Sequence, residues 1–170
     1  DDKGRDLLAM LVSGTRVSLQ VGLLATLIAI LIGTIMGVVS AYFGGWVDQV
    51  LMRFTDIMMT FPFFILLVFI IFIFGPSLVF IILVIGLTGW TGAARLVRSE
   101  ALSLRTREFV MASRSLGASD ARIVFRHLIP NVLSSVIVIA TLSIPGVILA
   151  EAALSFIGLG DPTVTSWGMI

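Results

Sequence analysis

The chain has 170 residues, of which 58% carry apolar side chains and only 12% are charged, and its mean hydropathy is +1.14. This composition excludes an ordinary soluble domain and predicts a protein embedded in a membrane. The formal net charge of +1 gives no excess of charge that points to nucleic acid. The chain contains no cysteine, which excludes disulfides, and its single histidine leaves no cysteine or histidine cluster for a metal.

Runs without any charged residue predict four membrane-spanning helices. Residues 17–47 form a run of 31 residues, which at about 1.5 Å per helical residue exceeds the roughly 30 Å hydrocarbon layer. Residues 57–94 form a run of 38 residues, and a Gly-Pro-Ser sequence at 75–77 is expected to divide it into a helical hairpin. Residues 128–150 form the last run, where Pro130 suits a helix start or a kink. The predicted spans cover about residues 17–43, 57–74, 78–94 and 128–150.

The remaining charges predict the orientation of these spans. Seven of the eleven basic residues lie in the loop 95–127, which has a net charge of +4. The positive-inside rule therefore places this loop in the cytoplasm. Counting the spans outward from it places residues 44–56 in the cytoplasm as well, and puts Gly75, residues 1–16 and the chain from Glu151 onward outside.

The residue types within the predicted spans disfavour several kinds of activity. No ionisable residue lies deep within a span, and this disfavours ion-coupled transport. The only lysine, Lys3, lies outside any phosphate-binding loop, so the chain is not expected to hydrolyse nucleotide itself and any energy must come from a partner. No catalytic residue, metal ligand or cofactor is predicted in this chain. Glu151 is expected just beyond the fourth span, where a position facing the solute pathway is the functional interpretation and an outer-rim charge in contact with water is the simpler one.

The basic loop has more order than a tether between spans requires. Residues 107–116 predict a short helix that ends at Gly117, because glycine permits an abrupt turn after a helix. Ser119 then caps a second helix, with Asp120 in its first turn, where an acidic side chain suits the positive end of the helix dipole. The alternative is a solvated basic loop that only fixes topology and attracts anionic lipid, and the helix-turn-helix order weakens it.

At these residues the chain resembles the inner-membrane permease subunits of binding-protein-dependent ABC importers. Their cytoplasmic signature is Glu-Ala-Ala, three residues, Gly, nine residues, then Ile-x-Leu-Pro. Ala112, Gly117 and Pro130 match this signature at the required spacing. The residues that replace the signature at its other specified positions are Met111, Ser113, His127 and Ile129.

A wider set of motifs is similar to the dipeptide, oligopeptide and nickel importer branch, and most of all to the second of its two paired permeases. These motifs cover essentially the whole chain. They include Gly-Thr-Arg-Val-Ser-Leu at 14–19, Tyr-Phe-Gly-Gly-Trp-Val-Asp at 42–48, Leu-Gly-Ala-Ser-Asp at 116–120, Glu-Ala-Ala-Leu-Ser-Phe-Ile-Gly-Leu-Gly at 151–160 and Ser-Trp-Gly at 166–168.

The resemblance implies an all-α, polytopic transmembrane domain over residues 1–170, in a piece of a longer six-span chain. It implies a multi-pass protein of the cytoplasmic (inner) membrane of a bacterium or archaeon. The implied partners are a second homologous permease, two cytoplasmic ATPases that bind ATP and Mg²⁺, an extracytoplasmic solute-binding protein and the lipid bilayer, with no nucleic acid.

The resemblance also implies that the first short helix of the loop 95–127 seats in a groove on an ATPase. The residues expected to couple to the ATPase are Arg107, Glu108, Met111, Ala112, Ser113, Arg114, Ser115, Gly117 and Asp120.

Small residues on two spans predict close helix packing. Gly33 and Gly37 form a Gly-x-x-x-Gly pattern in the first span, and Gly86 and Gly89 belong to a small-residue surface on the third. Packing within one subunit is the simpler interpretation, and a seam between permeases or a pore wall is the functional alternative.

The expected function is a permease subunit without its own ATPase site, which forms half of an ATP-driven import pathway for dipeptides or oligopeptides. Import of nickel or another small solute is the alternative within the family. A self-contained channel and a non-transporting membrane scaffold are alternatives from other classes, and neither accounts for the helix-turn-helix loop.

Overall fold

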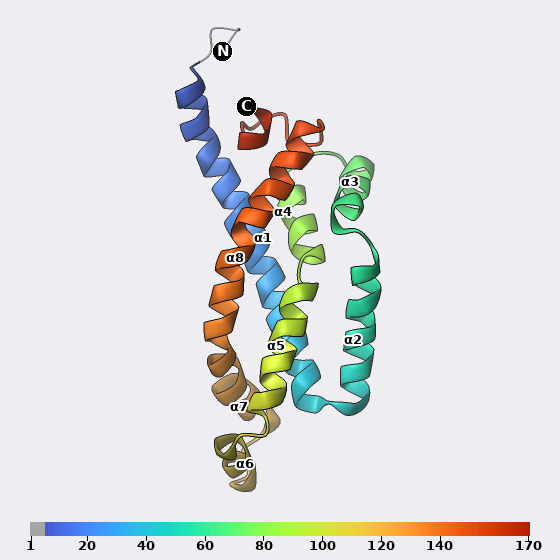
Figure 1. The fold of residues 1–170 in the computed structure, drawn as a ribbon, viewed down its shortest axis with the longest axis vertical. Helices are drawn as coiled ribbons and strands as arrows, with labels where there is room; N and C mark the ends of the chain where they lie inside the picture. Colours follow the sequence, from blue (N-terminus) through green and yellow to red (C-terminus); the bar gives the residue numbers. More distant parts are fainter. Residues whose placement is uncertain (1–5) are drawn as a thin grey trace. The chain divides into compact units, whose positions relative to one another are not determined.

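The computed structural model describes residues 6–170, and every regular element in this part of the chain is a helix (Figure 1). This confirms the predicted all-α fold class. The elements in chain order are α1 (Leu7–Phe43), α2 (Gly45–Thr60), α3 (Phe63–Phe74), α4 (Leu78–Thr88), α5 (Thr91–Leu104), α6 (Glu108–Ser115), α7 (Asp120–Ile123), the π-helix η1 (Val124–Leu128), α8 (Ile129–Phe156) and the 3₁₀-helix η2 (Trp167–Met169).

Three helical stretches of the described chain are long and apolar enough to cross a membrane, namely Leu7–Phe43, Leu78–Leu104 and Asp120–Phe156. Helices α2 and α3 meet the same criterion only when they are taken together, which raises the number of crossing segments to as many as four. The chain is therefore a multi-pass membrane protein, in agreement with the charge-free runs.

The second predicted span, residues 57–74, is not one helix. Helix α2 ends at Thr60 and α3 begins at Phe63, with Pro62 between them. Proline has no N–H to donate to the preceding turn, and it disfavours helical backbone in the residue before it. The helix therefore ends before Pro62, although the run contains no charge.

The break predicted at 75–77 is confirmed, because these residues separate α3 from α4. Gly75 has a φ of 91°, a backbone conformation that favours glycine. The third predicted span, residues 78–94, is longer than expected, since α4 and α5 form a helical stretch that continues to Leu104. The first charged residues of the predicted loop 95–127 therefore lie on a helix.

Helix α8 also extends beyond the predicted span 128–150. It begins at Ile129, whose N–H donates to the carbonyl of Val124 five residues earlier, and η1 is this wider turn. The next residue, Pro130, has no N–H to donate. The helix therefore continues through the π-turn as far as the proline, and α8 follows η1 without a gap.

The chain divides into two units, and α1 and α8 each contribute to both. The described part of unit 1 contains residues 6–28, 61–89 and 142–170, and unit 2 contains residues 29–60 and 90–141.

Unit 1 has a core formed by α3, α4 and parts of α1 and α8. A Cβ added at Gly86 of α4 would lie 2.7 Å from the Cβ of Ile28, so this glycine permits a close approach to α1. Gly89 ends α4 as its C-cap and donates its N–H to the carbonyl of Ile85. The buried core residues include Val21, Ala25, Leu67, Ile71, Ile81, Ile85 and Leu154.

Unit 2 packs the second part of α1 against α5 and the helices that follow it. A Cβ at Gly33 would lie 2.6 Å from the Cβ of Ala93, and one at Gly37 would lie 2.6 Å from the carbonyl oxygen of Ala94. The two glycines therefore let the backbones of α1 and α5 approach closely, and a role in a pathway stays a prediction. The buried core includes Val38, Ala41, Tyr42, Val97, Ala101, Val110, Ile123, Leu128 and Val132.

Candidate functional site

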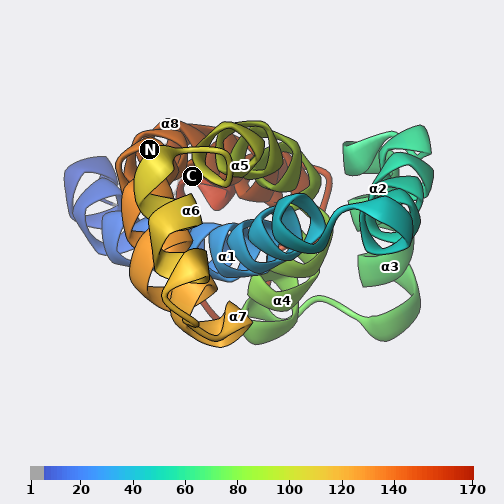
Figure 2. The ribbon, with the colours of Figure 1, turned by 90° about the horizontal axis from the view of Figure 1, so that it is seen from below.

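Residues 105–120, here named the α6 segment, contain the helix predicted at 107–116 and the turn predicted at Gly117. Helix α6 has Glu108 in its first turn and Arg114 in its last turn, which suits the helix dipole at both ends. After α6, Gly117 has a φ of 80°, and its N–H donates to the carbonyl of Arg114. The Ser119 hydroxyl then accepts from the N–H of Arg122 and caps α7. The helix-turn-helix order expected from the sequence is confirmed (Figure 2).

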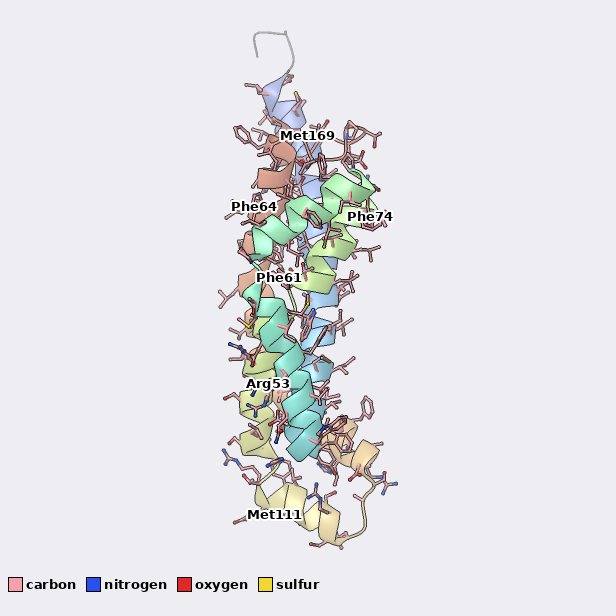
Figure 3. All side chains as sticks on the ribbon, turned by 90° about the vertical axis from the view of Figure 1, so that its right-hand side faces the viewer. Arg53, Phe61, Phe64, Phe74, Met111 and Met169 are labelled. Atoms are coloured by element: carbon pink, nitrogen blue, oxygen red, sulfur yellow. The ribbon has the colours of Figure 1, made fainter. Side chains whose placement is uncertain are left out.

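Most side chains of the α6 segment are exposed in this chain. Met111, which is labelled in Figure 3, is 53% exposed, and Leu116 is 88% exposed. The exposed residues also include Arg107, Glu108, Phe109, Ala112, Arg114, Ser115, Gly117 and Asp120. Exposed apolar side chains gathered on one short element are typical of a surface that binds a partner.

One face of α6 is anchored in unit 2. Val110 is 1% exposed and belongs to the core of that unit. The hydroxyl of Ser113 lies 3.2 Å from Nε2 of His127 on η1, and the rings of Phe109 and His127 have centroids 6.0 Å apart. His127, which replaces an isoleucine of the family signature, therefore holds α6 against the start of the following helix.

Residues before and after α6 in the chain both bind the end of α1. Arg105 donates from Nη1 to the carbonyl oxygen of Ala41 at 2.7 Å. Tyr42 donates its hydroxyl to Oδ1 of Asp120 at 2.6 Å, and the guanidinium carbon of Arg114 lies 5.3 Å from the centre of the Tyr42 ring. Sequence reasoning placed Arg114 and Asp120 at a docking surface but missed their partner Tyr42, because Tyr42 and Asp120 are 78 residues apart in the chain.

Charges predicted to lie in loops pair between α2 and α5. Arg98 donates to both carboxylate oxygens of Asp48, at 2.5 and 2.6 Å, and Ser40 also donates to that carboxylate. Arg95 pairs with Asp56 at 2.5 Å, with both side chains about half exposed. These pairs fix α2 to α5 within unit 2.

Glu151 corrects the expectation of an outer-rim carboxylate in contact with water. Helix α8 continues to Phe156, so Glu151 lies within a helix, and it is only 2% exposed. Ser155 donates to its Oε1 at 2.6 Å, and Ser166 donates to Ser155 at 3.3 Å. The end of a charge-free run shows where the apolar sequence ends, but it does not show where the helix ends. Helix α8 continues past this point, so Glu151 lies in the packed part of unit 1.

Asp161 makes a link within unit 1 that the sequence interpretation missed. Its Oδ2 accepts from the N–H of Leu78 at 2.9 Å, at the start of α4, and its Oδ1 accepts from the N–H and hydroxyl of Thr163. The hydroxyl of Thr163 and these N–H groups lower the pKa of the Asp161 carboxyl. Asp-x-Thr is a local signal for such a turn, but its link to α4 depends on tertiary structure.

Among residues 6–170, no group of three or more histidine or acidic side chains is placed to hold a metal ion.

Comparison with known proteins identifies related membrane components. Residues 9–168 match the family described as binding-protein-dependent transport system inner membrane component. The chain is 43% identical to the oligopeptide transport system permease protein OppC of Haemophilus influenzae, over 100% of this chain and 55% of that protein. It is 40% identical to the dipeptide transport system permease protein DppC of Bacillus subtilis, over 100% of this chain and 53% of that protein.

A third relative, the oligopeptide transport system permease protein OppC of Escherichia coli K12, is 43% identical over 100% of this chain and 57% of its own length. The chain thus spans about half the length of the curated relatives that it matches.

Proposed function

The chain belongs to the family of inner-membrane components of binding-protein-dependent transport systems, and on that premise we propose that it forms part of the import pathway for dipeptides or oligopeptides. In this proposal it is one of two permease subunits in the cytoplasmic membrane of a bacterium. Two ATPases supply the energy, and an extracytoplasmic binding protein delivers the solute.

One observation carries the choice of peptide as solute. Identity of 38 to 43% over essentially the whole chain links it to relatives named oligopeptide or dipeptide permeases. The names of these relatives refer to peptides, which favours a peptide over nickel as the solute.

The α6 segment supports the proposed contact with an ATPase. It presents Phe109, Met111 and Leu116 to the exterior while Val110 anchors it to unit 2. A short helix that is anchored on one face and exposed on the other, with Met111 and Ala112 among its exposed residues, suits insertion into a groove on a partner. In the proposal this segment lies in the cytoplasm, as its basic residues predict.

The test uses the full-length protein that contains this chain, purified from native membranes with its partners. We expect an ATPase and a homologous permease to copurify. Reconstituted vesicles supplied with loaded binding protein and internal ATP should take up radiolabelled dipeptide or oligopeptide, while ⁶³Ni²⁺ uptake stays at background. A homo-oligomer that conducts without ATP would overturn the proposal and support a channel, and uptake of nickel alone would overturn the peptide assignment.

A further inference from the structure

The α6 segment has a different relation to α1 than to α5 and α8. Helices α5 and α8 are joined to the segment through the chain, by Arg105 on one side and by α7 and η1 on the other. Any movement of α6 therefore reaches them through the backbone. Helix α1 has no such link, so it senses the segment only through noncovalent contacts.

Two of those contacts bind consecutive residues of α1. Ala41 and Tyr42 lie in the last turn of that helix, where carbonyl groups lack partners within the helix. Arg105, just before α6, donates to the carbonyl of Ala41, and Asp120, just after α6, accepts from the hydroxyl of Tyr42. The first and the last residue of the α6 segment therefore each bind the end of α1.

The surroundings of Tyr42 make this contact specific. The residue is 6% exposed and its ring belongs to the same core as Val110 of α6. Its hydroxyl donates to a charged acceptor, which is a stronger arrangement than a bond between neutral groups. Arg114 lies over the ring, so one side chain of α1 contacts both α6 and the first residue of α7.

We propose that the hydrogen bond from Tyr42 to Asp120 transmits movement of the α6 segment to α1, and that both residues are positioning residues for transport. The inference rests on the proposed function, because it assumes that an ATPase moves α6. When α6 shifts, the bond and the Arg105 contact carry the end of α1 with it. Without the bond, α6 can move while α1 lags, and ATP is hydrolysed without equivalent transport.

The experiment compares three variants with the unaltered full-length protein in its assembled, reconstituted complex. Tyr42→Phe removes the donor and keeps the ring, and Asp120→Ala removes the acceptor at an exposed site. The third variant combines both changes. The matched control is Asp56→Asn, which removes an ion pair of unit 2 that joins α2 to α5 and includes no residue of α1.

The measured quantity is the number of peptide molecules taken up per ATP hydrolysed, together with the thermal stability of the complex. We expect Tyr42→Phe and Asp120→Ala each to lower this ratio about tenfold or more, the range that loss of one hydrogen bond to a charged group supports. Because both changes remove the same bond, the double variant should be no worse than the more affected single variant. Asp56→Asn should keep the unaltered ratio.

An unchanged ratio in both single variants overturns the proposal, even if either variant is less stable, since a merely structural bond affects stability and yield alone. If Tyr42→Phe fails to assemble, Asp120→Ala decides, because its side chain lies outside the core. Failure of the unaltered complex to import peptide would instead remove the proposed function, and the ratio distinguishes the two outcomes.

Discussion

Gly37 of α1 lies so close to Ala94 of α5 that a Cβ on the glycine would be 2.6 Å from the alanine carbonyl oxygen. Backbone atoms cannot yield as a flexible side chain does, so Gly37→Ala should force the helices apart and destabilise the protein by about 1 to 3 kcal/mol. Thermal unfolding of the purified protein measures this loss.

Gly92→Ala is the matched control for this prediction. Gly92 lies on α5, and a Cβ there would meet nothing within 4 Å. Alanine should be neutral or stabilising there, because glycine inside a helix costs about 1 kcal/mol relative to alanine. Equal melting temperatures for the two variants would contradict the close contact between α1 and α5.

Glycine is required at position 117 for its backbone conformation, and not because a larger side chain would clash with a neighbour. Its φ is 80°, and nothing lies within 4 Å of an added Cβ. Gly117→Val should therefore strain the turn by about 1 kcal/mol or more and re-aim α6, whereas Gly117→Asn should retain more function because asparagine adopts this conformation more readily. Peptide uptake by the assembled complex should rank glycine, asparagine, valine. Equal uptake by all three would show that the turn does not set the direction of α6.

Gly117 and Gly75 also show what a single sequence can predict. Gly117 follows a short helical pattern and Gly75 precedes a proline, so local chemistry predicts both turns. The break at Pro62 was missed because a charge-free run was interpreted by its length alone. The burial of Glu151 and the bond from Tyr42 to Asp120 were missed for another reason, since both depend on helix ends and contacts that only the fold brings together.

The predicted topology can be tested at two loops. A reporter active only outside the cytoplasm should work when it is inserted at Ser77, between α3 and α4, and fail at Ala118, between α6 and α7. The reason is the excess of basic residues around α6, which keeps that loop on the cytoplasmic side. The reverse pattern would place the α6 segment outside, beyond the reach of a cytoplasmic ATPase.

Asp161 predicts a dependence of stability on pH. Because its partners lower the pKa of its carboxyl below the unfolded value, it stabilises the folded state above about pH 4, and this contribution is lost as the pH falls through the lowered folded pKa. Asp161→Asn keeps one acceptor but does not titrate. The difference in melting temperature between the two proteins should therefore stay constant from about pH 6 to about pH 4 and shrink below about pH 4, and a difference that stays constant over the whole range would argue against an ionised cap on α4.

The proposed docking surface can be tested directly because the chain contains no cysteine. Ala112 and Ser115 are exposed on α6, so a single cysteine at either position should crosslink to cysteines placed around the docking groove of the ATPase. Ser103→Cys is a suitable control, since that residue is exposed on α5, before the α6 segment. A solvated loop that only fixes topology predicts no crosslink from any of the three positions. Crosslinks from Ala112→Cys and Ser115→Cys that are absent from Ser103→Cys would assign the contact to α6, whereas equal yields at all three would show collision and not docking.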